Sequence, residues 1–163
     1  MNARINSSFC AGATNGERTL FAMTMPGLVR PLDDDLNILI ENDVGAIVTL
    51  TEDSILIPLP YRKRFRLFHL PVENLEPPTL KQVIRFVDFV EAEFSRGVNV
   101  AVHCLMGIGR TGTMIAAYRV SMGEEPQEAI DNLREIRNFI ETKEQEEIVH
   151  KYYRHLQKRR GKA

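Results

Sequence analysis

The sequence predicts an α/β fold in which helices flank a mainly parallel central sheet. Short apolar segments of the kind found in buried strands alternate along the chain with segments of helical periodicity. The 163 residues are 44% hydrophobic and 26% charged, which suits one globular domain with its own core. We therefore expect a flexible lead-in over residues 1–17, a single domain over 18–156 and a basic tail over 157–163.

The first expected elements are a strand, a helix and two further strands. The strand over 19–27 ends in a Pro-Gly pair. The helix over 32–45 has acidic residues in its first turn, where they suit the positive end of the helix dipole. The β-branched run over 46–51 is typical of a buried strand. Two prolines indicate a loop over 54–66, and another strand follows over 65–72.

The second half begins with a helix from Thr79 to Gly97, because Thr79 and Gln82 have the spacing of a capping box. The clearest strand of the chain follows over 98–104. Three more helices are expected, namely one over 110–122, one that starts at Pro126, and one after the capping-box pair Thr142 and Gln145.

Composition excludes several classes of protein. The formal net charge of −1 at pH 7 predicts neither a nucleic-acid nor a membrane partner. No apolar run approaches the roughly 20 residues that span a bilayer, and the N-terminus lacks the apolar core of a signal peptide. Cys10 and Cys104 are the only cysteines, which argues against a disulfide scaffold and for a cytoplasmic setting, although one bridge between them stays open. No cluster of Cys and His predicts zinc.

The segment VHCLMGIGRTGT, residues 102–113, follows the clearest strand, where ligands bind in open α/β sheets. Gly107, Gly109 and Gly112 satisfy the glycine pattern of a dinucleotide-binding loop. That fold also needs the turn directly after the strand and an acid at the end of the next strand. Here HCLM intervenes, and the acids over 124–131 lie at the start of a helix. A dinucleotide site is therefore disfavoured.

The spacing of Cys104 and Arg110 favours a different chemistry. Backbone N–H groups of a loop over 105–110 can point at phosphate oxygens, and the following helix directs its positive end to the same place. Arg110 can bind two of those oxygens, and the concentrated positive charge favours the thiolate form of Cys104. Thr111 can donate its hydroxyl to that sulfur. A single buried cysteine is usually structural, but the full pattern at a strand–helix junction favours a nucleophile. His103 is expected to orient the loop.

These residues resemble the signature of the cysteine-dependent protein tyrosine phosphatases, most of all the compact dual-specificity type. Weaker likenesses follow in the family's order along residues 18–156, namely TMPG with RPLDDDL, IVTLTED, LPVENLEPPTL and FIETKEQE. The resemblance implies that Cys104 attacks phosphorus and forms a cysteinyl-phosphate, that Arg110 stabilises the transition state, and that Thr111 assists breakdown of the intermediate.

The same resemblance implies a substrate and a binding loop. The substrate is a protein or peptide with phosphotyrosine, with phosphoserine and phosphothreonine as further candidates, and the protein is a monomer. Phosphoryl transfer needs positioning and charge, so we expect no metal and no cofactor. The implied substrate-binding residues are Leu105, Met106, Gly107, Ile108, Gly109 and Arg110. Three of these side chains are uncharged where phosphatases of inositol lipids often have lysines, which favours a phosphorylated side chain.

The donor of the leaving-group proton is where the sequence departs from the family. The position of the usual Asp is Asn74, and an amide cannot donate a proton as an acid. Three outcomes stay open: Glu73 takes the role, Glu76 or Glu141 reaches the site, or acid catalysis is weak. We favour Glu73. Because the loss of a general acid costs about 10²–10⁴-fold, the alternative function is a phosphate- or phosphopeptide-binding module with little turnover.

Three further features have two interpretations each. Gln145 matches a glutamine that positions the hydrolytic water in related enzymes, and it also fits a capping box with Thr142. Glu52, at the end of a strand, resembles an acid that braces Arg110, although a solvated acid fits equally well. The basic residues over 62–66 are expected near the rim of the site, either to steer anions or as a solvated loop.

Overall fold

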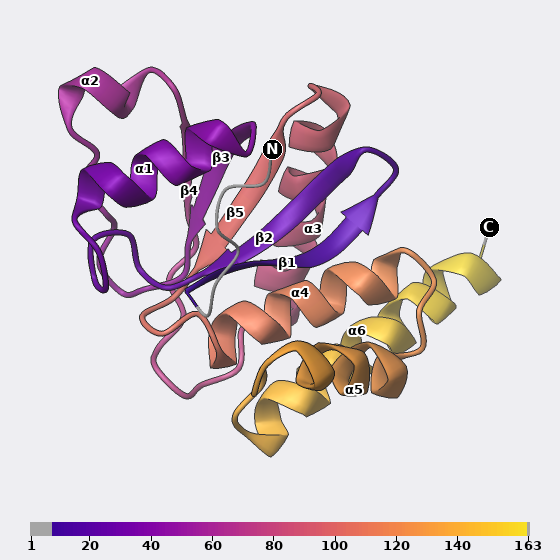
Figure 1. The fold of residues 1–163 in the computed structure, drawn as a ribbon. Coiled ribbons are helices and arrows are strands. Elements are labelled where there is room, and N and C mark those ends of the chain that lie inside the picture. Colours follow the sequence, from indigo (N-terminus) through magenta and orange to yellow (C-terminus); the bar gives the residue numbers. More distant parts are fainter. Residues whose placement is uncertain (1–7, 163) are drawn as a thin grey trace.

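A computed structural model describes residues 8–162 and has a five-stranded sheet in the order β1-β2-β5-β3-β4 (Figure 1). The first two strands pair antiparallel, and all the other pairs are parallel. This agrees with the predicted α/β class and mainly parallel sheet. The strands are β1 (Phe9–Asn15), β2 (Arg18–Met23), β3 (Val44–Thr49), β4 (Arg66–His69) and β5 (Asn99–His103).

Helices cover both faces of the sheet, because successive strand residues point to opposite sides. On one face, Val100 and Val102 of β5 pack in a core with α3 to α6; on the other, Ala101 packs in a core that includes α1. Within residues 8–162, no helix is both long and apolar enough to cross a membrane. The helices are α1 (Leu32–Glu41), α2 (Leu59–Arg62), α3 (Leu80–Ser95), α4 (Gly109–Ser121), α5 (Pro126–Ile136) and α6 (Lys143–Gly161).

Both predicted capping boxes are confirmed. The Thr79 side chain accepts a hydrogen bond from the backbone N–H of Gln82 at the start of α3. The Thr142 side chain accepts the corresponding bond from Gln145 at the start of α6. In each case the glutamine side chain returns a bond to the backbone of the cap residue, so the first turn of each helix is fixed from both sides.

The sheet register brings four loops to one edge. His103 at the end of β5 pairs with Thr49 of β3 and with Met23 of β2, and Thr49 pairs with His69 of β4. Since these four strands are parallel, the loops that follow them all lie at the carboxyl-terminal edge of the sheet. The loop after the central strand β5 therefore has the other three loops around it.

The expected lead-in over 1–17 is wrong for residues 9–15, which form β1; residues 1–7 lie outside the described part. Its small residues resemble a loop, yet they permit close packing on α4. A Cβ atom at Gly12 would overlap the side chain of Ile115. The expected tail is also helical, since α6 continues to Gly161. Within the expected loop over 54–66, the short helix α2 forms.

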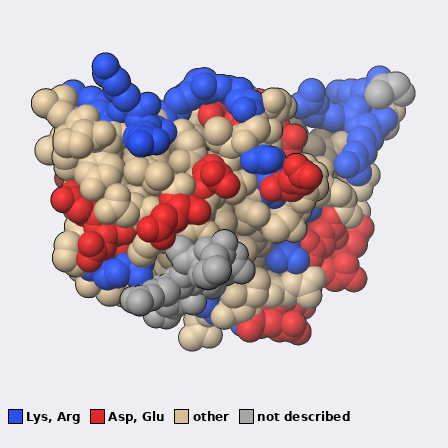
Figure 2. Space-filling model, turned by 45° about the horizontal axis from the view of Figure 1, so that its top comes forward, with Lys and Arg blue, Asp and Glu red and all other residues tan. Residues whose placement is uncertain are grey.

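The basic segment 62–66 does not lie at the rim of the loop that follows β5. It precedes β4, and parallel strands begin at the same edge of a sheet, so it lies at the opposite edge. There Arg64 lines a hollow of about 490 Å³ with Arg18, Asp43 and Gly97. Figure 2 brings the top of Figure 1 forward and shows Lys and Arg side chains along the upper border of that face. The prediction that these residues lie near the rim of the site was wrong, and the alternative of a solvated basic loop agrees with their exposure.

Candidate active site

The predicted nucleophile lies at the carboxyl end of the central strand. Cys104 follows β5 directly, is almost fully buried, and is a free thiol, as is Cys10. The Thr111 hydroxyl in the first turn of α4 donates a hydrogen bond to the Cys104 sulfur at 3.2 Å. The positive end of α4 lies at the same place. The strand, loop and helix thus bring Cys104 and Thr111 together as predicted.

The loop between β5 and α4 presents a set of unengaged donors. The carbonyl of Leu105 accepts a bond from the N–H of Met25 at 2.9 Å, and that of Ile108 accepts one from Ile140 at 3.2 Å. The N–H groups of residues 105–108 make no hydrogen bond with the described part of the chain. A trans peptide directs its N–H away from its own carbonyl. Because these carbonyls bond to the surrounding chain, the N–H groups on the other side of the loop are available to an anion.

Two glycines of this loop are closely surrounded, and the backbone requires the first of them. Gly107 has φ +68°, and a Cβ atom there would overlap the Met23 carbonyl of β2. At Gly109, a Cβ atom would overlap the carboxylate of Glu141. The sheet has no strand after β5 along the described chain, so the acid that a dinucleotide site needs has no strand to carry it. The glycines therefore fit the predicted phosphate-binding loop, and residues 104–110 are called the phosphate cradle below.

Arg110 is held by three acceptors and is only 3% exposed. Its Nη1 donates to a Glu52 carboxylate oxygen at 3.1 Å and to the Val72 carbonyl at 2.7 Å. Its Nη2 donates to the Asn74 side-chain oxygen at 3.3 Å. A guanidinium has five N–H donors, so Nε–H and one N–H of Nη2 remain without a described partner. Two such donors of one guanidinium can bind phosphate oxygens in pairs.

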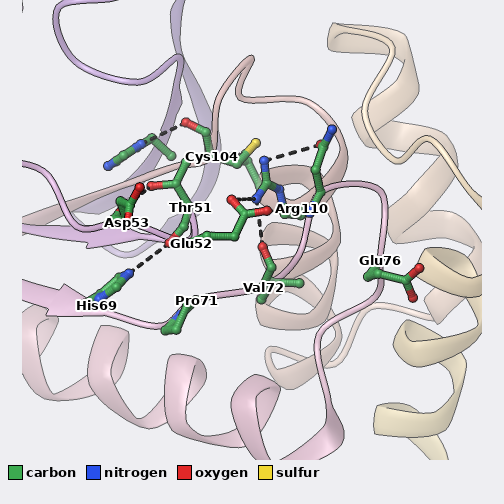
Figure 3. A network of polar contacts seen from close by, with 12 residues as sticks. Thr51, Glu52, Asp53, His69, Pro71, Val72, Glu76, Cys104 and Arg110 are labelled. Atoms are coloured by element: carbon green, nitrogen blue, oxygen red, sulfur yellow. Dashed lines mark hydrogen bonds and ion pairs between the residues drawn. The ribbon is translucent and has the colours of Figure 1, made fainter.

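Glu52 links Arg110 to the neighbouring loop (Figure 3). Its second oxygen accepts the backbone N–H of Asn74 at 2.9 Å. Hydrogen bonds from its own backbone N–H, from Asn74 and from Arg110 hold the pKa of the Glu52 carboxyl below its usual value. The carboxylate is therefore charged at neutral pH and faces the guanidinium. The expected bracing contact between Glu52 and Arg110 is present.

Asn74 contributes an acceptor rather than an acid. Its amide oxygen binds Arg110, and its N–H binds Glu52, so the loop after β4 closes on the arginine through both groups. The next residue, Leu75, has φ +67°, a left-handed conformation that a leucine adopts at a cost. The tight turn at Asn74 thus brings its side chain to Arg110.

His103 fixes the base of the cradle. Its Nδ1 lies 2.9 Å from the Cys104 carbonyl, which can only accept, so this nitrogen carries the proton. The other nitrogen, Nε2, then accepts from the Thr49 hydroxyl at 2.9 Å. The pKa of His103 is lowered to about 4, mainly by burial; the bond to the Cys104 carbonyl opposes this shift, and the charge of Arg110 adds to it. The neutral imidazole, hydrogen-bonded through both ring nitrogens, is placed to orient the loop as expected.

The three candidate acids occupy different surroundings. The Glu141 carboxylate lies against Gly109 of the cradle, next to the side chain of Gln145. Glu73 is exposed, and its side chain makes no hydrogen bond or ion pair with a described residue. Glu76 contributes its backbone carbonyl to Gln145 at 3.4 Å, while its side chain lies apart from the polar network (Figure 3). Only Glu141 has its carboxylate beside the cradle.

Gln145 is buried between Gly109 of the cradle and the backbone of Glu141. Its side-chain oxygen accepts the backbone N–H groups of Glu141 and Thr142, at 2.8 and 3.2 Å. Its side-chain nitrogen lies near Gly109 and donates to the Glu76 carbonyl. The capping and site interpretations are therefore compatible, because the cap itself positions Glu141.

The sequence named Glu141 in the α5–α6 connection as a candidate but did not identify Arg137 or Ile140 as part of the site. Arg137 Nη2 lies 3.5 Å from the Met106 carbonyl. The backbone N–H of Ile140 donates to the Ile108 carbonyl, and Ile140 itself has φ +66°. Arg137 also lies beside Cys10, and the pKa of that thiol is raised because burial outweighs the opposing effect of the guanidinium. A β-branched residue in the left-handed region is unusual, and neither position has a local sequence signal. Only the tertiary contacts identify them.

The family comparison agrees with this geometry. A family model described as "Polymorphic toxin system, DSP-PTPase phosphatase" matches residues 21–124, more than half of the chain. The match runs from the second half of β2 past the end of α4 and includes the whole cradle.

Individual relatives align with part of the chain at about one third identity. The chain is 34% identical over 96 residues to an uncharacterized protein of Methanocaldococcus jannaschii, with 58% of this chain and 64% of that one aligned. It is 36% identical over 106 residues to the tyrosine-protein phosphatase of Autographa californica nuclear polyhedrosis virus, covering 58% and 59%. The chain thus spans just under two thirds of the length of these relatives.

Solved structures share the fold. A mutant form of Tk-PTP superposes with a TM-score of 0.74 at 27% identity, over 86% of this chain and 93% of that one. PTPMT1 in complex with PI(5)P superposes with a TM-score of 0.78 at 21% identity, over 93% and 97%, which supports the fold alone. From the matching family model and the cradle it contains, we conclude that the chain belongs to the DSP-PTPase phosphatase family.

Proposed function

We propose that the protein hydrolyses phosphate monoesters of protein side chains, phosphotyrosine first, through a cysteinyl-phosphate. The observation that carries this proposal is the set of unengaged donors around Cys104: the N–H groups of residues 105–108 and two N–H groups of Arg110. Such donors suit the equatorial oxygens of a phosphoryl group in transfer. The sulfur lies beside them, below the position that phosphorus would take.

The reaction has two steps. The Cys104 thiolate attacks phosphorus, the bond between phosphorus and the tyrosine oxygen breaks, and that oxygen takes a proton from a nearby acid. Water then attacks the cysteinyl-phosphate, and sulfur leaves as the thiolate, which the Thr111 hydroxyl stabilises through its hydrogen bond. Arg110 supplies positive charge in both steps, and Glu52 with Asn74 keeps its guanidinium oriented.

We assign the proton donor to Glu141 ahead of Glu73, the residue that the sequence favoured. The Glu141 carboxylate lies against Gly109, whereas no contact holds the Glu73 side chain near the cradle. The backbone of Glu141 is fixed by Gln145, which also lies close enough to orient a water over the cradle. The same carboxylate can remove the proton of that water in the second step.

The substrate and setting of the protein are part of the proposal. PTPMT1 has been solved with a phosphoinositide, but the cradle here has Leu105, Met106 and Ile108 where extra phosphates would need cations. We therefore propose that the substrate is a phosphorylated protein segment. The enzyme would act as a monomer in the cytoplasm. The free thiols of Cys10 and Cys104 suit a reducing compartment.

The decisive experiment is a single-turnover reaction with p-nitrophenyl phosphate and a phosphotyrosine peptide, in the presence of EDTA and with and without vanadate. The proposal predicts release of phosphate in EDTA, inhibition by vanadate, and a phosphorylated Cys104 after acid quenching. Phosphopeptide binding with no phosphate released in a long incubation would instead support a binding module. A panel with phosphoserine, phosphothreonine, inositol phosphates and nucleotides then ranks the substrates.

A further inference from the structure

A cavity adjoins the phosphate cradle on the side of Glu52 and Asn74. It has a volume of about 270 Å³, and Arg110 forms part of its wall. Its apolar wall comes from three loops, those after β2, β3 and β5. The lining residues are Met25, Thr51, Glu52, Asp53, Ser54, Ile55, Asn74, Leu105 and Arg110. A phosphate bound by Arg110 would therefore have an apolar space beside it for the group that carries it.

The loops that line this cavity also carry exposed apolar side chains, which we name the apolar collar. Each member is a chain neighbour of a cavity-lining residue or lies within four residues of one. Val29 is 62% exposed, Leu56 is 83% exposed and Met106 is 52% exposed. Exposed apolar side chains grouped around a site mark a binding surface. The collar consists of Leu28, Val29, Leu56, Leu75 and Met106.

The exposed charges around the collar that form no ion pair are mostly acidic, since Arg30 beside Val29 pairs with Asp35 and Arg137 lies at the Met106 carbonyl. Asp53, Glu73 and Glu76 are exposed, and their carboxylates form no ion pair with residues 8–162. The basic segment 62–66 lies at the opposite edge of the sheet, as described above, and Arg110 is paired with Glu52. An anionic lipid surface recruits Lys and Arg next to the apolar side chains that insert. This collar has the opposite sign, so charge complementarity favours a partner with positive charge.

We infer that the apolar collar binds a protein segment with a large apolar residue next to the phosphotyrosine and with Lys or Arg farther out. The inference rests on the proposed function and adds the sequence class of its substrate. The phosphate occupies the cradle, the aromatic ring enters the cavity, and the neighbouring apolar side chain covers the collar. Basic residues beyond it meet Asp53, Glu73 and Glu76. Burial of apolar area supplies affinity, while the charges set the orientation.

The test compares two phosphotyrosine peptides that differ only beside the phosphotyrosine, where one has Leu and the other Ser. We expect kcat/KM for the Leu peptide to be about tenfold higher, the effect of burying part of one large apolar side chain. In the double variant Val29→Ser with Leu56→Ser, the ratio should fall toward one. The matched control is Met122→Ser, at the far end of α4 and 40% exposed, which should keep the ratio.

The charge component is tested with Asp53→Asn and Glu76→Gln together. The advantage of a peptide with flanking Lys over one with flanking Glu should shrink in this variant, and added salt should shrink it in the unaltered protein. Equal rates for the two Leu and Ser peptides, or a ratio that the collar variant leaves intact, would overturn the inference. So would faster hydrolysis of phosphatidic acid in phosphatidylcholine vesicles than of any peptide.

Hydrolysis of p-nitrophenyl phosphate separates this inference from the proposed function. If that compound is not hydrolysed, the proposed function fails. If it is hydrolysed while the peptide ratios stay near one, the function stands and the collar has no role in substrate choice.

Discussion

The two sides of the site differ in how they are held. On the nucleophile side, Cys104 and Arg110 are buried, and the cradle carbonyls are bonded to the β2–α1 loop, to His103 and to the α5–α6 connection. On the donor side, the candidate acids are exposed: Glu73 and Glu76 lie in a loop attached to the site mainly through Arg110 and Glu52, and Glu141 lies on the α5–α6 connection. On the rigid side, the nucleophile and the cradle are held in a single arrangement. The exposed side offers several carboxylates for one role.

This difference suggests that substitutions on the two sides affect activity in different ways. A fixed cradle stabilises charge in the transition state because its dipoles need no reorganisation. The donor side only has to place one proton near a leaving oxygen, which a loop can do from more than one position. Loss of a cradle residue should therefore affect all substrates, whereas loss of the donor should affect those with poor leaving groups.

The largest effect is expected for Cys104→Ser, which removes the nucleophile and leaves the donors of the cradle in place. Turnover of every substrate should become undetectable, while phosphopeptide binding measured by calorimetry persists. Cys10→Ser is the matched control and should keep its turnover, since Cys10 lies on β1 outside the cradle. Phosphate release that survives Cys104→Ser would contradict the assignment of the nucleophile.

The second effect separates the candidate acids. Glu141→Gln should lower kcat by about 10²–10⁴-fold for phenyl phosphate, whose leaving group needs a proton, and much less for p-nitrophenyl phosphate. The measurement is kcat against the pKa of the leaving group, and this dependence should be steeper in Glu141→Gln than in the unaltered protein. Glu73→Gln is the competing variant and should leave that dependence unchanged. If only Glu73→Gln steepens it, the sequence-based choice is right and the assignment of Glu141 is wrong.

The same contrast explains which parts of the site could be predicted from the sequence. The cradle is a contiguous segment, and its requirements are local: a nucleophile after a strand, glycines that allow close approach, and a helix N-terminus. The capping boxes at Thr79 and Thr142 are local too. Spacing alone was therefore enough to place Cys104, Arg110 and Thr111.

The donor side depends on segments far apart in the chain, so spacing could not define it. Arg110 meets Glu52 from the loop after β3 and Asn74 from the loop after β4, and only the sheet register brings them together. Glu141 reaches the cradle because Ile140 adopts a left-handed backbone, which its side chain disfavours. Tertiary packing overrides that local preference, and no sequence pattern reports it.

A pH-dependent effect on stability should come from the rigid side. The pKa of His103 is about 4 in the folded protein against 6.5 for the free side chain, so the unfolded chain binds the extra proton first as pH falls. Stability is therefore complete above about pH 6.5 and declines toward pH 4, by about 3 kcal/mol in the free energy of unfolding. Urea unfolding across this range is the measurement.

The control for this pH effect is His103→Gln, which has hydrogen-bonding groups but no titration. Other titrating groups are common to both proteins, so their difference isolates His103. Arg110 and His69, whose charges also disfavour the protonated ring, are unchanged in the variant. The buried imidazole is not the cause if the two proteins lose stability equally between about pH 6.5 and pH 4.

The smallest effect is expected for Arg137→Met, which tests whether the α5–α6 connection belongs functionally to the rigid side. Methionine keeps a long apolar side chain against Phe139 but removes the donor to the Met106 carbonyl. Because the bond is long, kcat/KM should fall by about tenfold at most. As a cradle effect, the loss should be equal for p-nitrophenyl phosphate and phenyl phosphate, and Arg137→Lys should restore part of it. Arg154→Met, which removes a surface pair with Glu147, is the control. A loss confined to poor leaving groups would instead assign Arg137 to the donor side, through the position of Glu141.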